Sequence, residues 1–136
     1  MVSKTMDVRG FLTVIALLAG CTKPPAPPPT DRATLIEQRK DAVVDQLANC
    51  ESGPGEGHGS RYAGRFQFEP RTVIAFVKER DGRVLSAQEA VALARDYGQA
   101  SALAKYIIFE RDGAGHWPAC SRRLGLSRQV AEIRAL

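Results

Sequence analysis

The sequence predicts one small, mainly α-helical domain with a minor β element, over residues 31 to 136. Three observations predict it: apolar residues recur at helical spacing, glycine and proline separate the helical segments, and helix-capping residues stand at their boundaries. The chain has 136 residues, which leaves room for one domain at most. Its 44% hydrophobic and 25% charged residues are ordinary for a globular protein.

The first expected helix starts after Thr30 or Asp31, either of which can cap it, runs to about Asn49 and ends within residues 50–52. Its apolar side chains fall on one broad face, and its charged ones mostly on the other. Four glycines and one proline within residues 53–59 then end the helix and predict an irregular loop.

A short strand or hairpin arm is expected at residues 61–68, where apolar and polar side chains weakly alternate. Pro70 suits the first turn of a second helix, which ends at the Asp81-Gly82 turn. The spacing of Ser86 and Glu89 is that of a capping box and predicts the start of a third helix.

A fourth helix is expected from Gln99 to about Arg111, with Gly98 separating it from the third. Residues 116–120 are expected to form a compact segment. Ser127 is a candidate cap for a last short helix ending at Leu136.

The N-terminal segment predicts export. Lys4 and Arg9 precede a short apolar run at residues 11–18, followed by small residues and Cys21, which is the pattern of a secretory signal. Residues 18–21, Leu-Ala-Gly-Cys, resemble the lipobox of bacterial lipoproteins, which implies a signal peptide at residues 1–20 and a lipidated Cys21. The alternative is a short uncut membrane anchor with Cys21 as an ordinary thiol.

Residues 21–30 are expected to form a tether, because the run Pro-Pro-Ala-Pro-Pro-Pro at 24–29 favours an extended spacer of about 3 Å per residue. The chain would then be held at the membrane by its lipid, in the periplasm or at the cell surface. In Gram-negative lipoproteins an aspartate after the lipidated cysteine indicates inner-membrane retention. Thr22 at that position favours the outer membrane by the same resemblance.

The net charge of +4 is spread along the chain, without a basic block or an aromatic-interleaved patch that would indicate nucleic-acid binding. Mild excess positive charge usually serves solubility, although it would also attract anionic cell-wall polymers. The sequence implies no cofactor.

With Cys21 assigned to lipid, Cys50 and Cys120 form an even pair in an oxidising compartment, where a disulfide is the default. A metal site is the alternative. A metal site would need further ligands besides the cysteines, His58 and His116, and the sequence has no Cys-x-x-Cys or His-x-x-x-His spacing. We therefore expect a disulfide and no metal.

Glu51 stands where the first helix meets the glycine-rich loop, beside a cysteine expected to be disulfide-bonded. A carboxyl shielded from water there would have a raised pKa, because desolvation disfavours its charged form, and it could act as a general acid. Glycosidases such as lysozyme use an acid of this kind to protonate the leaving oxygen of a glycosidic bond. The alternative is a solvated glutamate at a helix end.

Three motifs, at residues 50–52 (Cys-Glu-Ser), 64–68 (Gly-Arg-Phe-Gln-Phe) and 117–120 (Trp-Pro-Ala-Cys), resemble the lysozyme-like domains of soluble lytic transglycosylases and of resuscitation-promoting factors. The resemblance covers about residues 42 to 121. It implies an α+β lysozyme-like fold and cleavage of peptidoglycan glycan strands.

By this resemblance Glu51 is the catalytic acid, and the expected substrate-binding residues are Ser52, Tyr62, Phe66 and Gln67. Core packing is the alternative for the aromatic side chains of this segment. Trp117 is expected to pack in the core beside the disulfide, with a sugar-binding surface as its alternative. Glu56 and Glu69 are candidates for a second carboxylate, with plain surface charge as the alternative. The Ala-Tyr-Asn step common in transglycosylases is absent, so a non-catalytic glycan-binding or structural lipoprotein is the competing hypothesis.

Overall fold

The computed structural model describes residues 31–53 and 61–136. The expected signal peptide at 1–20, the lipidated Cys21 and the tether at 21–30 lie outside these residues, as do Glu56 and His58. They therefore remain predictions from the sequence.

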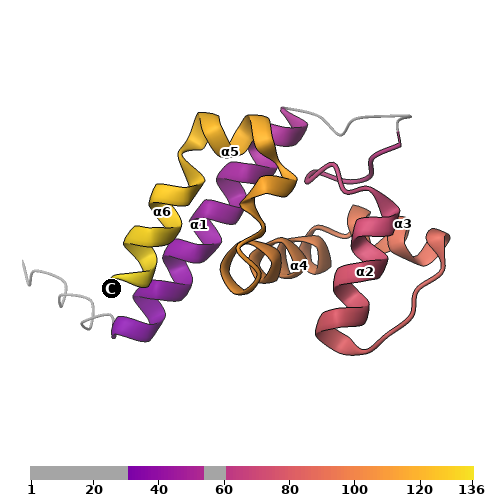
Figure 1. Cartoon of the computed structure of the whole chain (residues 1–136), viewed down its shortest axis with the longest axis horizontal. Coiled ribbons are helices and arrows are strands. Elements are labelled where there is room, and N and C mark those ends of the chain that lie inside the picture. Colours follow the sequence, from indigo (N-terminus) through magenta and orange to yellow (C-terminus); the bar gives the residue numbers. More distant parts are fainter. Residues whose placement is uncertain (1–30, 54–60) are drawn as a thin grey trace, which may run out of the picture.

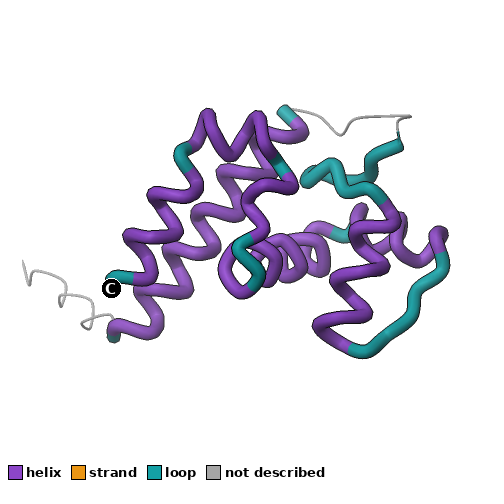
Figure 2. Tube along the Cα trace, viewed as in Figure 1, coloured by secondary structure: helices purple, strands orange, loops and turns teal. Residues whose placement is uncertain are grey.

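Helices make up most of the described chain, as Figures 1 and 2 show. The elements are α1 (Arg32–Ser52), α2 (Pro70–Asp81), α3 (Ala87–Arg95), α4 (Tyr97–Glu110), the 3-10 helix η1 (Gly113–His116), α5 (Pro118–Leu124) and α6 (Leu126–Arg134). The mainly α prediction is confirmed. The β element expected at 61–68 is reduced to one antiparallel bridge, between Ala63 and Phe68, and the described residues contain no longer strand.

Three predicted helix boundaries are confirmed by their capping contacts. The Asp31 carboxylate accepts a hydrogen bond from the Thr34 amide at 3.0 Å, at the start of α1. Gly82 ends α2 with a left-handed φ of 69°, which glycine adopts without steric cost. Ser86 and Glu89 form both hydrogen bonds of the capping box at the start of α3.

The end of α1 at Ser52 also agrees with the prediction. Two other boundaries differ from it. Gly98 lies inside α4, because the Asp96 carboxylate caps that helix by accepting from the Gln99 amide at 2.8 Å. Ser127 is not the cap of α6, which already begins at Leu126, directly after a left-handed Gly125.

The helices form two groups joined by α4. Figure 1 shows α1, α5 and α6 on one side and α2 with α3 on the other, with α4 between them. α4 contacts α1, α2, α3 and η1, whereas α1 packs mainly against α4, α5 and α6. Among the described residues, no helix has the length and apolarity needed to cross a membrane.

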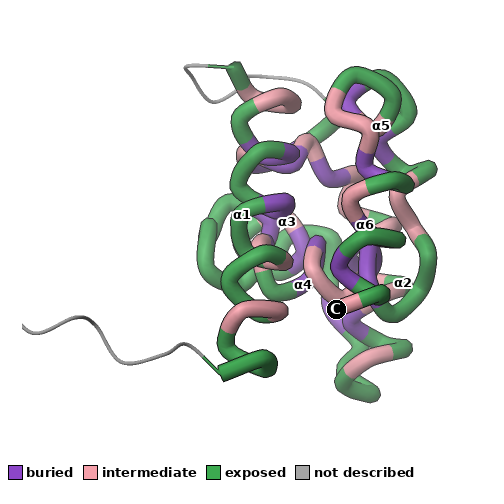
Figure 3. Tube along the Cα trace, turned by 90° about the vertical axis from the view of Figure 1, so that its left-hand side faces the viewer, coloured by how far each residue is buried: buried purple, intermediate pink, exposed green. Residues whose placement is uncertain are grey.

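One apolar core connects the two groups of helices. Figure 3 shows that the buried stretches of α1 and α6 face inward. The largest side chains with almost no exposed surface come from α1, the 61–68 segment, α2, α4 and α6: Val44, Leu47, Phe66, Val73, Val77, Leu103, Ile107, Ile108 and Leu126. Ala63, Phe66 and Phe68 therefore anchor the 61–68 segment in the core, while Arg61 and Tyr62 at its start are exposed.

Candidate functional site

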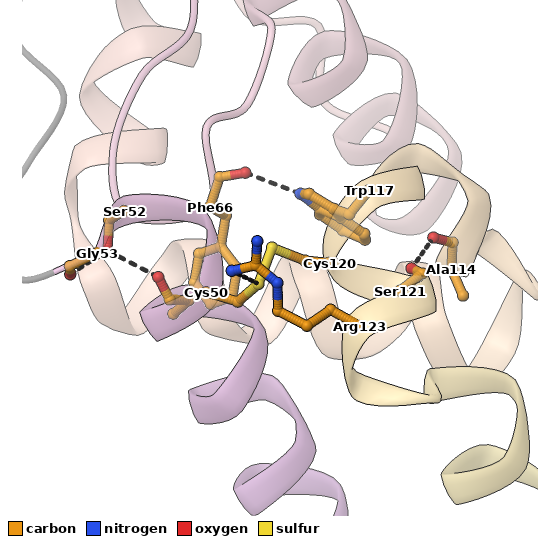
Figure 4. The surroundings of a disulfide bond; sticks show 10 residues. Cys50, Ser52, Gly53, Phe66, Ala114, Trp117, Cys120, Ser121 and Arg123 are labelled. Atoms are coloured by element: carbon orange, nitrogen blue, oxygen red, sulfur yellow. Dashed lines mark hydrogen bonds between the residues drawn. A yellow bond between two sulfur atoms is a disulfide. The ribbon is translucent and has the colours of Figure 1, made fainter.

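A disulfide joins Cys50 in the last turns of α1 to Cys120 in α5, with an S–S distance of 2.04 Å and a Cα–Cα distance of 5.9 Å (Figure 4). The disulfide prediction is confirmed, and the metal alternative for these two cysteines is excluded because both sulfurs are already bonded. The Arg123 guanidinium lies 4.0 Å from Cys50 Sγ. Elsewhere in the described chain, no three His, Cys, Asp or Glu side chains cluster closely enough to hold a metal ion.

Glu51 continues the buried face of α1 by one turn. It follows Leu47 by four residues and Ala48 by three, the spacings that place side chains on the same face of a helix. Leu47 and Ala48 have no exposed surface, while Glu51 is half-buried. The carboxyl therefore stands on the core-facing side of α1, at the end of the helix.

Burial raises the pKa of the Glu51 carboxyl above its ordinary value. Among the described residues, desolvation is the only cause, and no cation there offsets it by favouring the charged form. The carboxylate makes no hydrogen bond or ion pair with another described residue. A half-buried carboxyl in such surroundings is able to keep its proton to a higher pH than a free glutamate does.

Ser52 uses its hydroxyl within the helix. Its Oγ donates to the Ala48 carbonyl at 2.7 Å, the contact drawn in Figure 4, and lies 3.3 Å from the Gly53 carbonyl. A serine one turn from a carbonyl at a helix end commonly makes this bond. The proton of Ser52 is thus engaged, and only the lone pairs of Oγ remain for a ligand.

A tight turn carries Gln67. The backbone of Ala63 and Phe68 exchanges two hydrogen bonds, of 2.8 and 2.9 Å, around residues 64–67. Gly64 is required at its start, because a Cβ there would lie 1.8 Å from the Ala94 carbonyl oxygen at the end of α3. We call residues 63–68 the aromatic turn.

Gln67 adopts a left-handed backbone conformation, with a φ of 51°. This conformation is uncommon for a residue other than glycine, asparagine or aspartate, and it costs of order 1 kcal/mol. The side-chain Nε2 donates to the Gly64 carbonyl at 2.9 Å, which folds the amide back over the turn. The Oε1 acceptor has no partner among the described residues.

The two phenylalanines of the aromatic turn belong to the core. Phe66 has no exposed surface and Phe68 is 2% exposed. Trp117 is also buried, and its indole Nε1 donates to the Phe66 carbonyl at 2.8 Å (Figure 4). The ring of Phe66 therefore offers no surface to a sugar, and core packing is its role. Tyr62, by contrast, is 45% exposed.

Four residues that the sequence did not single out tie the aromatic turn to α1. Arg65 donates to the Asn49 side-chain oxygen, and its guanidinium lies 4.9 Å from the centre of the Tyr97 ring. The Tyr97 hydroxyl donates to the Asp45 carboxylate. Because these partners are 16 to 52 positions apart, no local pattern in the sequence could have indicated them.

The structure thus places Glu51 and Gln67 on two segments that are bound to each other, the end of α1 and the aromatic turn. Of the candidate second carboxylates, Glu69 is paired with Arg71 at 2.9 Å. A cavity of about 560 Å³ lies between α4, η1 and α6, and none of the predicted site residues lines it.

In comparisons with known proteins, no family model, no curated protein and no solved structure matches this chain. The functional assignment therefore depends on the residues of the site.

Proposed function

We propose that this chain is a lipid-anchored envelope protein whose lysozyme-like domain cleaves peptidoglycan glycan strands, with Glu51 as the catalytic acid. The observation that carries the proposal is the half-buried Glu51 carboxyl, which has no partner among the described residues and whose pKa is raised by desolvation. The order of the three sequence motifs and the Cys50–Cys120 disulfide beside Glu51 support it. Anchoring through Cys21 rests on the lipobox resemblance.

In the proposed reaction, protonated Glu51 donates its proton to the oxygen that bridges two alternating amino sugars, and the bond from that oxygen to the anomeric carbon breaks. The resulting carboxylate then takes the proton of a muramyl hydroxyl, whose oxygen bonds to the same anomeric carbon. The product is an anhydro end, and no water is consumed. One carboxyl is enough for this route, whereas hydrolysis needs a second carboxylate or an ordered water.

Two side chains of the 61–68 segment are suited to binding the glycan. The Oε1 of Gln67 can accept a hydrogen bond from an acetamido N–H. The exposed ring of Tyr62 offers an apolar face to a sugar ring. These roles replace the one expected for Phe66, whose ring is buried.

Mass analysis of the products tests this proposal. The purified full chain is incubated with cell-wall sacculi, and the soluble fraction is examined for muropeptides. We expect fragments with anhydro ends, which are lighter by one water than the reducing ends that hydrolysis leaves. Absence of any soluble glycan would contradict the cleavage reaction, and reducing ends alone would contradict the single-carboxyl route.

A non-catalytic glycan-binding module is the second candidate. The observations that favour it are the absent Ala-Tyr-Asn step and the pairing of Glu69, the described candidate for a second carboxylate, with Arg71. It predicts retention of the chain on sacculi without product, and the same retention after Glu51→Gln.

A further inference from the structure

The aromatic turn is attached to four different helices, and Arg65 makes the attachment to α1. Gly64 lies against the end of α3, and the Phe66 carbonyl accepts from Trp117 just before α5. The Phe66 ring stacks on Tyr97 of α4, with ring centres 5.9 Å apart and planes 10° apart. Within the described residues, only Arg65 connects the turn by a side-chain hydrogen bond to the helix that carries Glu51.

Arg65 and Tyr97 contact the same face of α1 at two levels. Asn49 accepts from Arg65, and Asp45, one helical turn earlier, accepts from Tyr97. The Arg65 guanidinium also covers the Tyr97 ring, at 4.9 Å from its centre. The two contacts are thus coupled through Tyr97, and the register between the turn and α1 is fixed at two points.

The face that these contacts use is not the one that carries Glu51. Asn49 precedes Glu51 by two residues, a spacing that places two side chains on different sides of a helix. Arg65 therefore holds the turn against the last turns of α1 through a face of the helix that Glu51 does not share. A guanidinium suits this task because it is planar, so it can stack on a ring and donate sideways at the same time.

We propose that Arg65 is a positioning residue, which sets the aromatic turn, and with it Gln67, relative to Glu51. The inference rests on the proposed function, because it assigns Arg65 a role in the same site. Since reacting groups that are misplaced by about 1 Å can lose a hundredfold in rate, the register of the turn bears directly on turnover.

The test compares full-chain variants on sacculi, at a temperature where circular dichroism shows each of them folded. Arg65→Ala and Asn49→Ala are each expected to lower the release rate at saturating sacculi by about tenfold or more. Arg65→Lys is expected to lose most of that rate too, since an ammonium cannot stack and donate as a planar fork does. The matched control is Arg61→Ala, an exposed arginine in the same segment, which should leave the rate unchanged.

The double variant Arg65→Ala/Asn49→Ala should be no slower than Arg65→Ala alone, because each substitution removes the same contact between Arg65 and Asn49. Three results would overturn the positioning role. They are losses that multiply in the double variant, a release rate of Arg65→Ala equal to that of Arg61→Ala, and a rise of the half-saturating concentration without a fall in the release rate. Glu51→Gln, assayed in parallel, separates the two ideas. Release that depends on Glu51 but not on Arg65 rejects only the positioning role, whereas release that is absent or indifferent to Glu51 rejects the proposed function and the inference with it.

Discussion

The indole Nε1 of Trp117 donates a hydrogen bond of 2.8 Å to the backbone carbonyl of Phe66, across 51 positions of sequence. Both residues are buried, so the carbonyl has no water to replace this donor. The bond fixes the aromatic turn to the segment that enters α5, one helical turn from the Cys50–Cys120 disulfide. Two crosslinks, one covalent and one polar, therefore hold the same corner of the domain.

Replacing Trp117 by phenylalanine tests the polar crosslink. The variant leaves a buried carbonyl without a donor and removes part of a buried ring, so the free energy of unfolding should fall by about 2–4 kcal/mol. Denaturant titration measures the change. A loss below about 0.5 kcal/mol would show that the bond and the packing of the indole contribute little.

Removing the disulfide should have a similarly large effect. The bond closes a loop of 70 positions, so Cys50→Ala/Cys120→Ala should lower the free energy of unfolding by about 4 kcal/mol in the chain-entropy model. Denaturant titration of the wild-type chain with a thiol reductant should reproduce that loss. The same reductant should leave the stability of the double variant unchanged, and a further loss there would show that its effect is unrelated to this bond.

The raised pKa of Glu51 predicts how stability depends on pH. A carboxyl whose pKa is higher in the folded than in the unfolded chain stabilises the fold fully below the unfolded pKa, and this contribution is lost as pH rises through the folded pKa. Glu51→Gln has no titrating carboxyl at this position, so its free energy of unfolding does not decrease in this way as pH rises. Relative to wild type, the variant should therefore gain stability between acidic and neutral pH, by less than about 1 kcal/mol because the group is half-exposed.

Glu89 provides the control of opposite sign. Its pKa is lowered by the hydrogen bond from the Ser86 amide, so its contribution to stability is present above the unfolded pKa and lost as pH falls. Relative to wild type, Glu89→Gln should lose stability as pH rises. Equal slopes for the two variants, measured by denaturant titration across the acidic to neutral range, would contradict the burial of Glu51.

The left-handed backbone conformation of Gln67 predicts that a substitution at this position can weaken glycan binding without a large change in the stability of the fold. Gln67→Gly relieves the backbone cost at a φ of 51° and loses one side-chain hydrogen bond, so stability should stay within about 1 kcal/mol of wild type. Retention on sacculi should nevertheless fall if the amide binds glycan. Gln67→Val, which is β-branched and disfavoured at this φ, should destabilise the fold by more than about 1 kcal/mol. Undiminished retention of Gln67→Gly would remove Gln67 from the site.

The helices were predictable where local chemistry decides them. The Ser86–Glu89 capping box and Gly82 act within one turn of chain, and the structure confirms both. The errors arose where one local signal outweighed another. Because Asp96 caps α4, the helix begins before Gly98 and this glycine does not separate it from α3. The left-handed Gly125 lets α6 begin before Ser127.

The site was predictable only in part, because some of its contacts join residues that are far apart in the sequence. The cysteine count predicted the disulfide, and the Cys-Glu-Ser step drew attention to Glu51. Alternation could not distinguish an aromatic side chain on a glycan surface from one in the core, and Phe66 is in the core. The contacts of Arg65 with Asn49 and Tyr97 join segments that only the packing of α1, α4 and the aromatic turn brings together.

The most direct test of the central claim is the rate at which full-length wild type and Glu51→Gln release soluble muropeptides from sacculi at neutral pH. Glutamine keeps the shape of the side chain but has no acidic proton to donate. We predict measurable release by wild type and a loss of at least about a hundredfold in the variant, as expected when a general acid is removed. Release at equal rates by both proteins, or by neither, would contradict the role of Glu51 as the catalytic acid.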